Sequence, residues 1–138
     1  MSCIFCKIIA GEIPADKVYE DHKILAFLDI SPVNKGHVLI IPKEHYENLM
    51  ATPDELVKDL WAMAKKIAKA VQEATGADGI NFGSNNGKAA GQIVFHTHIH
   101  VIPRFKDDGL IGWPNKKYEE GEQAEMAGKV RNQLTRNN

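Results

Sequence analysis

Three histidines occupy every second position of a short run in the second half of the chain: His96, His98 and His100. Alternate side chains of a β-strand share one face, so a strand over residues 94–103 would place the three imidazoles together. Each buried imidazole needs a hydrogen-bond partner, so three imidazoles on one face are unfavourable in a hydrophobic core. A lone histidine is commonly a satisfied core residue, whereas three at period two predict a site for nucleophilic or metal-binding chemistry.

A loop of small residues leads into this strand. It spans Gly83–Gly91 and reads GSNNGKAAG. Glycine lets backbone N–H groups approach phosphate oxygens closely, so such a loop can hold an anion. By itself this composition is equally typical of a flexible turn. Its position directly before the histidines favours a phosphate-binding loop beside a nucleophile.

A Cys-x-x-Cys pair, Cys3 and Cys6, lies near the start of the sequence. This spacing is a common zinc half-site, because the turn lets both thiolates reach one ion. The alternatives are a redox pair and two idle thiols. A redox pair usually opens a helix that follows a strand, and no predicted strand precedes Cys3.

The overall composition of the chain limits which folds and which partners are possible. The 138 residues are 43% hydrophobic and 25% charged, with a net charge of −1, which fits a single domain over residues 1–138. No basic stripe with interleaved aromatic residues is present, so we expect no nucleic-acid partner. Neither an apolar run of ~18 residues nor a secretory signal is found, so we expect no membrane partner. These features predict a cytoplasmic protein with reduced cysteines.

Short apolar runs around one long amphipathic segment predict an α+β fold with an antiparallel sheet of about five strands. The expected strands are Val18–Glu20, Ile24–Asp29, His37–Pro42, Ile80–Gly83 and Val94–Pro103, and the expected helices are Pro53–Thr75 and Lys116–Leu134.

The long helix carries start and stop signals. Thr52 can cap it, Glu55 can complete a capping box with Thr52, and Gly76 can end it. One apolar stripe at spacings of three and four defines its buried face: Leu56, Leu60, Met63, Ile67 and Val71.

The chain resembles the histidine triad family almost end to end. The His-x-His-x-His run followed by apolar residues carries the resemblance, together with CIFC at 3–6, FLDISP at 27–32 and GHVLIIP at 36–42, in the family's order. The likeness is greatest to the histidine triad nucleotide-binding branch and its bacterial relatives. It implies a histidine-triad-like α+β fold with one long helix and a C-terminal helix.

The resemblance also implies a nucleotide hydrolase. His98 would attack the α-phosphorus of a purine nucleoside phosphoramidate or adenylate, and water would hydrolyse the nucleotidyl-histidine to release the nucleoside monophosphate. Neutral imidazole suits this role, since its ordinary pKa is near ~6.5. His100 would bind the phosphate and orient His98, and His96 completes the catalytic triad. The remaining nucleotide contacts implied by the family are Asp29 at the ribose hydroxyls, Ile30 beside the nucleoside, and Asn85, Gly91 and Gln92 at the phosphate.

Zinc is implied at Cys3, Cys6, His45 and His96, by likeness to zinc-binding bacterial members of the family. Four protein ligands leave no open coordination position, so this zinc would be structural.

Residue 93 departs from the family pattern. Animal members have a serine where this chain has Ile93, and an isoleucine cannot protonate a departing amine. The resemblance implies a homodimer. Part of the long helix, with Trp61 beside its apolar stripe, is expected to meet the symmetry mate; the alternative is that Trp61 only covers the core of a monomer. His37 is read either as a partner of the triad or as a simple strand-start residue.

Three other functions remain open from the residues. A dinucleoside polyphosphate hydrolase is one, and a nucleotide-binding module with negligible turnover is another. The third is a catalytic metalloenzyme in which His96, His98 and His100 ligate zinc.

Overall fold

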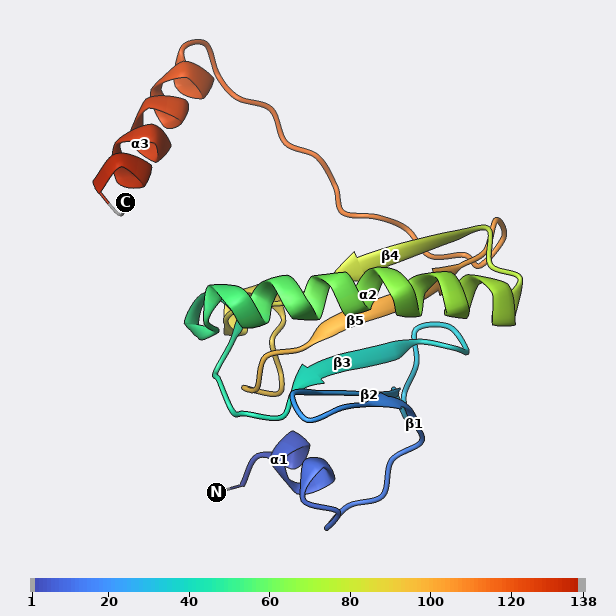
Figure 1. Ribbon diagram of the computed structural model, residues 1–138. Helices are drawn as coiled ribbons and strands as arrows, with labels where there is room; N and C mark the ends of the chain where they lie inside the picture. Colours follow the sequence, from blue (N-terminus) through green and yellow to red (C-terminus); the bar gives the residue numbers. More distant parts are fainter. Residues whose placement is uncertain (1, 137–138) are drawn as a thin grey trace. The chain divides into compact units, whose positions relative to one another are not determined.

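The computed structural model describes residues 2–136 and contains a five-stranded antiparallel sheet in the order β1-β2-β3-β5-β4. The predicted α+β class is confirmed. Figure 1 shows the strands side by side with the long helix along the sheet. The strands are β1 (Lys17–Glu20), β2 (Ile24–Leu28), β3 (Val38–Pro42), β4 (Gly79–Gly83) and β5 (Ile99–Arg104).

Three α-helices and two single turns of 3-10 helix complete the described chain. Their bounds are α1 (Ile4–Ile9), η1 (Leu49–Ala51), α2 (Asp54–Thr75), η2 (Lys88–Ala90) and α3 (Glu122–Arg136). The helix α1 was not predicted from the sequence, because six residues are too few to show a 3.6-residue period.

The central strands β2 and β3 are buried on both faces of the sheet. On β2, Ile24 and Ala26 pack with α2, whereas Leu25 and Phe27 pack with α1. Each of these four side chains is almost completely buried. The predicted apolar stripe of α2 is confirmed. Leu60, Ile67 and Val71 belong to the buried cluster between α2 and the sheet, and Leu56 and Met63 pack against it. The site described below lies on the α1 face.

The start of α2 differs from the predicted capping box. The helix begins at Asp54 after Pro53, and no side chain caps it. Thr52 is buried instead and donates its hydroxyl hydrogen to the carbonyl of Asn48 at 2.8 Å. Gly76 ends the helix in the left-handed region, as predicted.

The strand that carries the histidines is shorter than the predicted Val94–Pro103. It begins at Ile99, so His96 and His98 lie in the connection before it. The reason is pairing, because the register with β3 and β4 starts only at Ile99 and His100. The predicted C-terminal helix also starts late, at Glu122, directly after Gly121 in a left-handed conformation.

The described residues group into two compact units, one ending at Asp108 and the other beginning at Gly109. The second unit contains α3, whose apolar residues Met126, Val130 and Leu134 are exposed. A single domain over residues 1–138 stays a prediction.

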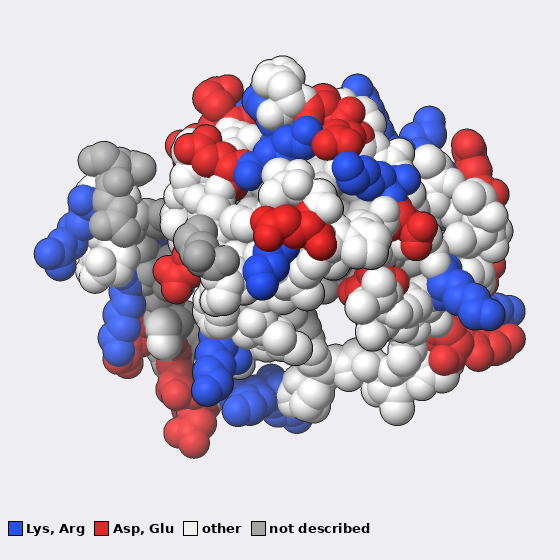
Figure 2. Space-filling view, turned by 90° about the horizontal axis from the view of Figure 1, so that it is seen from below, with Lys and Arg blue, Asp and Glu red and all other residues white. Residues whose placement is uncertain are grey.

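Charged side chains of both signs are interspersed on the surface. On the face in Figure 2, blue and red groups alternate without a continuous stripe of either sign. Ion pairs such as Lys23–Asp59 and Lys43–Glu20 join neighbouring groups. No helix within residues 2–136 is long and apolar enough to cross a membrane.

The turn before β3 yields a stability prediction. Gly36 has φ +102°, and a Cβ built on it would lie 2.7 Å from the Thr75 side chain at the end of α2. We expect Gly36→Ala to lower the free energy of unfolding by about 1–3 kcal/mol, through backbone strain and this clash. Urea denaturation measures it. Gly112→Ala is the control, because open space surrounds Gly112. Equal effects of the two substitutions would contradict the prediction.

Candidate active site and metal centre

The histidine cluster lies on the α1 face of the sheet. His100 pairs in register with Leu39, which packs on this face, while its neighbours Ile99 and Val101 pack against α2. Phe5 of α1 contacts the rings of both His96 and His98 edge-on, at centroid distances of 5.8 and 5.2 Å. The short helix α1 therefore covers the site.

The tautomer of His98 is set by the backbone. Its Nδ1–H donates to the carbonyl oxygen of His96 at 2.7 Å, which leaves a lone pair on Nε2. His98 is 8% exposed, and burial lowers its pKa below the ordinary value. Its imidazole is therefore neutral at pH 7 and has a nucleophilic nitrogen.

A chain of hydrogen bonds fixes the tautomers of His37 and His100. The backbone N–H of Val33 donates to His37 Nδ1 at 3.1 Å, so the proton of a neutral His37 is on Nε2. His37 Nε2 lies 2.9 Å from His100 Nδ1 and donates to it. His100 must then carry its own proton on Nε2. Burial, followed by the nearby His98 and His37, lowers the pKa of His100 to about 4.

The two adjacent imidazoles thus offer opposite groups. The rings of His98 and His100 are 5.0 Å apart, the first with a lone pair on Nε2 and the second with an N–H there. Such a pair can attack an electrophilic phosphorus while donating a hydrogen bond to an oxygen bound to it.

Asp29 and Ile30 adjoin this cluster at the end of β2. An Asp29 carboxylate oxygen lies 3.8 Å from His37 Nε2, and the other accepts the backbone N–H of Ser31 at 2.8 Å. The side chain of Ile30 is 92% exposed. Both residues lie where a ligand can reach them.

Asp29, His37 and His100 also each have a possible ligand atom within 4.8 Å of the others. The hydrogen bond from Val33 argues against metal binding there, because it places the proton of His37 on the nitrogen that would have to be the ligand. We therefore interpret the His37–His100 contact as a hydrogen bond.

The glycine loop is held by Gln92. Its buried amide donates to the carbonyls of Glu47 and Val94 and accepts the N–H of Gly87, at 2.7 to 3.1 Å. Since these bonds occupy the amide, a direct contact between Gln92 and phosphate stays a prediction. Gly91 has φ +90°, and a Cβ there would lie 3.5 Å from the Asn85 amide, so the two predicted phosphate-pocket residues are adjacent.

The residues predicted to bind zinc come together. The ligand atoms of Cys3, Cys6, His45 and His96 all lie within 4.8 Å of one another. The two Nδ1 atoms are 3.0 Å apart, and the sulfur–nitrogen distances include 3.4 and 3.6 Å. A tetrahedral zinc site with ordinary bond lengths has N···N and S···N separations of about 3.3 and 3.6 Å.

The protonation of this cluster also fits a cation. His96 Nε2–H donates to the carbonyl of Pro42 at 2.8 Å, which leaves Nδ1 with a lone pair aimed into the cluster. Burial, and then Cys3, raises the pKa of the Cys6 thiol. A divalent ion would reverse that effect and hold both sulfurs as thiolates.

The three triad histidines do not converge on one point. The Nδ1 atom of His96 points to the cysteines, while His98 bonds to the backbone and His100 to His37. Within residues 2–136, no candidate metal group combines the three. The geometry therefore does not favour the catalytic metalloenzyme.

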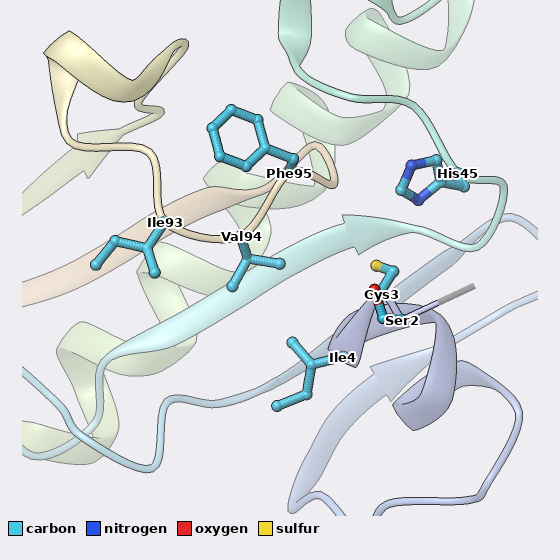
Figure 3. A pocket seen from close by; sticks show the side chains of 7 residues that line it. All are labelled: Ser2, Cys3, Ile4, His45, Ile93, Val94 and Phe95. Carbon is cyan, nitrogen blue, oxygen red and sulfur yellow. The ribbon is translucent and has the colours of Figure 1, made fainter.

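A cavity of about 380 Å³ borders the group of two cysteines and two histidines. Figure 3 shows that it lies between the start of α1 and the loop leading to His96. The side chain of Ile93 is 88% exposed. The lining residues are Ser2, Cys3, Ile4, His45, Ile93, Val94 and Phe95.

Several contributors to the site were not predicted. Phe5 was missed along with α1, although its place between the two cysteines was a usable signal. The buried pair Thr52 and Thr97, whose hydroxyl oxygens are 2.7 Å apart, joins residues 45 positions apart and leaves no local pattern.

The fold and the site together define an α+β domain with neutral imidazoles on one sheet face, beside a cluster of two cysteines and two histidines. The HIT domain family model matches residues 10–107, and the chain belongs to this family.

Known proteins of similar sequence and structure support the family assignment. Protein hit of Bacillus subtilis is 56% identical over 110 residues, which cover 79% of this chain and 76% of that protein. Adenosine 5'-monophosphoramidase hnt1 of Schizosaccharomyces pombe is 46% identical over 117 residues, covering 83% and 85%. The crystal structure of a Zn-bound histidine triad family protein from Mycobacterium smegmatis superposes with a TM-score of 0.77 at 42% identity, covering 98% of each chain.

The group of two cysteines and two histidines gives a prediction about zinc. Protein purified without added zinc should contain one zinc per chain, and chelation should lower its melting temperature, because a structural metal is coupled to folding. Cys6→Ser should lose the metal, whereas His22→Ala, in an exposed turn, should keep it. Metal analysis and thermal unfolding measure these effects. Metal-free protein that gains neither zinc nor stability on titration would show that the assignment is wrong.

Proposed function

We propose that the protein is a nucleotide hydrolase that cleaves purine nucleoside phosphoramidates or adenylates at the α-phosphate and releases the nucleoside monophosphate. The observation that carries the proposal is the pairing of a lone pair on His98 Nε2 with an N–H on His100 Nε2. The similarity to a protein named adenosine 5'-monophosphoramidase supports the same substrate class.

In the proposed first step, the lone pair of His98 Nε2 attacks the α-phosphorus and forms a P–N bond. The bond from phosphorus to the leaving group breaks, and its electron pair departs with the leaving group. His100 Nε2–H donates to a non-bridging oxygen, on which charge gathers in the transition state. Water then attacks the phosphorus of the nucleotidyl-histidine and forms a P–O bond, losing one proton to solvent. The P–N bond breaks, and its electron pair restores the lone pair of His98 Nε2.

A departing amine needs a proton in the first step. The exposed side chain of Ile93 has none to give, so the proton comes from water or from a histidine of the cluster. The proposal therefore includes adenylates, whose acidic leaving groups depart without protonation, as well as phosphoramidates.

The nucleotide is proposed to lie across the end of β2 and the glycine loop. Asp29, beside the imidazole cluster, would accept hydrogen bonds from the ribose hydroxyls, and the exposed Ile30 would pack on the nucleoside. Asn85 and Gly91, which adjoin each other, would contact the phosphate together with Gln92.

The proposed assembly is a homodimer. β4 is an edge strand, since it pairs only with β5 among the described strands, and an unpaired edge favours a second copy. Phe82 on this strand is 46% exposed and lies 6.3 Å, between ring centroids, from Trp61 of α2. These apolar rings would be covered in the dimer.

Substitution of His98 tests the catalytic proposal. We expect His98→Ala to lower turnover of adenosine 5'-monophosphoramidate by at least about 1,000-fold, because the covalent route is removed, while nucleotide affinity changes little. Rapid quenching with substrate labelled at the α-phosphate should trap a labelled adduct on the wild type and none on the variant. His22→Ala is the matched control.

Three outcomes would contradict part of the proposed function. Turnover by His98→Ala within a few-fold of the wild type would mean that another group is the nucleophile. Binding without turnover by the wild type would indicate a nucleotide-binding module. Preference for diadenosine polyphosphates over phosphoramidates would indicate the dinucleoside polyphosphate hydrolase.

The dimer gives a separate prediction. Light scattering at micromolar concentration should give about twice the chain mass of 15.3 kDa. Phe82→Lys, which places a charge on the exposed face of the edge strand, should shift the protein toward the monomer. A monomeric mass for the wild type would refute the dimer.

A further inference from the structure

The backbone around His98 lacks the support that a β-strand would provide. β5 begins at Ile99, and its register with β3 and β4 does not extend to residues 96–98. The position of the nucleophile proposed above must therefore be fixed by other contacts.

The peptide group between His96 and Thr97 is held on both sides. Its N–H, from Thr97, donates to the carbonyl of Tyr46 at 2.9 Å. Its carbonyl, from His96, accepts the Nδ1–H of His98 at 2.7 Å. Because a trans peptide is planar, the orientation of the N–H also determines that of the carbonyl. The hydrogen bond to Tyr46 thus orients the His96 carbonyl, and this carbonyl determines which nitrogen of His98 is protonated.

The hydroxyl of Thr97 reinforces this arrangement. Thr52 donates its single hydroxyl hydrogen to Asn48, so in the 2.7 Å contact between the two threonines Thr97 is the donor. Thr97 Oγ1 also lies 3.3 Å from the carbonyl of Tyr46. The two threonines are 1% and 5% exposed, and this shielding from water makes the pair a stable attachment point.

We propose that Thr97 is a positioning residue: its hydroxyl, bonded to Thr52, holds the peptide that keeps His98 protonated on Nδ1 and unprotonated on Nε2. The inference rests on the proposed function for its catalytic consequence only. The tautomer of His98 is a property of the protein without substrate and can be measured on its own.

The main test removes the hydroxyl and keeps the shape. In Thr97→Val, the full-length zinc-loaded protein should show a mixture of His98 tautomers in 15N–1H NMR spectra at pH 8, where the wild type shows protonation on Nδ1. Its kcat for adenosine 5'-monophosphoramidate should fall by about 10-fold, with KM little changed, as a misplaced nucleophile requires. Thr97→Ser, which restores the hydroxyl, should return both properties toward the wild type.

Two further variants separate positioning from general stability. Thr52→Val removes the acceptor without touching the triad run, and it should shift the His98 tautomer in the same direction. Thr75→Val removes a hydroxyl bonded to Val71 at the opposite end of α2, about 33 Å along the helix. It should lower stability without altering the tautomer or kcat.

The outcomes distinguish this inference from the proposed function. An unchanged His98 tautomer in Thr97→Val overturns the inference, whatever the activity, and Thr52→Val decides in the same way if Thr97→Val does not fold. A wild type that hydrolyses no nucleotide refutes the proposed function, while the NMR comparison still decides the role of Thr97.

Discussion

The site depends on one constraint, which is that a neutral imidazole has a single N–H and a single lone pair. A backbone group decides their placement in three of the cluster's histidines: the carbonyl of His96 for His98, the N–H of Val33 for His37, and the carbonyl of Pro42 for His96. His100 follows from His37. Burial lowers the pKa of each of these rings, so all four remain neutral and their directions are retained at pH 7.

The rest of the molecule can be understood as support for these backbone groups. α2 buries one face of the sheet and leaves the other for the imidazoles. α1 covers that second face with Phe5, and its two cysteines meet His45 and His96. The connection between β3 and α2 accepts hydrogen bonds at its carbonyls from the Gln92 amide and the backbone N–H of Thr97. Each support comes from a segment remote in sequence from the triad.

This remoteness explains what could be predicted from the sequence. The triad, the cysteine pair and the stripe on α2 are visible in the sequence because they depend on local spacing. The structure confirms the stripe and brings the cysteines together with His45 and His96, while the roles of these side chains stay predictions. Thr52 was predicted as a helix cap but bonds to Thr97 in the core, because a tertiary partner replaced the local one. The strand was predicted too long, since alternation shows which side chains share a face but not where pairing starts.

His96 belongs to both parts of the site at once. Its ring is directed at the cysteines and its carbonyl at His98, so the two centres share a residue and a displacement of one is transmitted to the other. A lineage that lost the cysteines would need new packing around position 96 before the neighbouring imidazole could keep its direction. A change at position 96 should therefore affect both centres at once, whereas a change at position 3, 6 or 45 reaches His98 only through the backbone of residue 96.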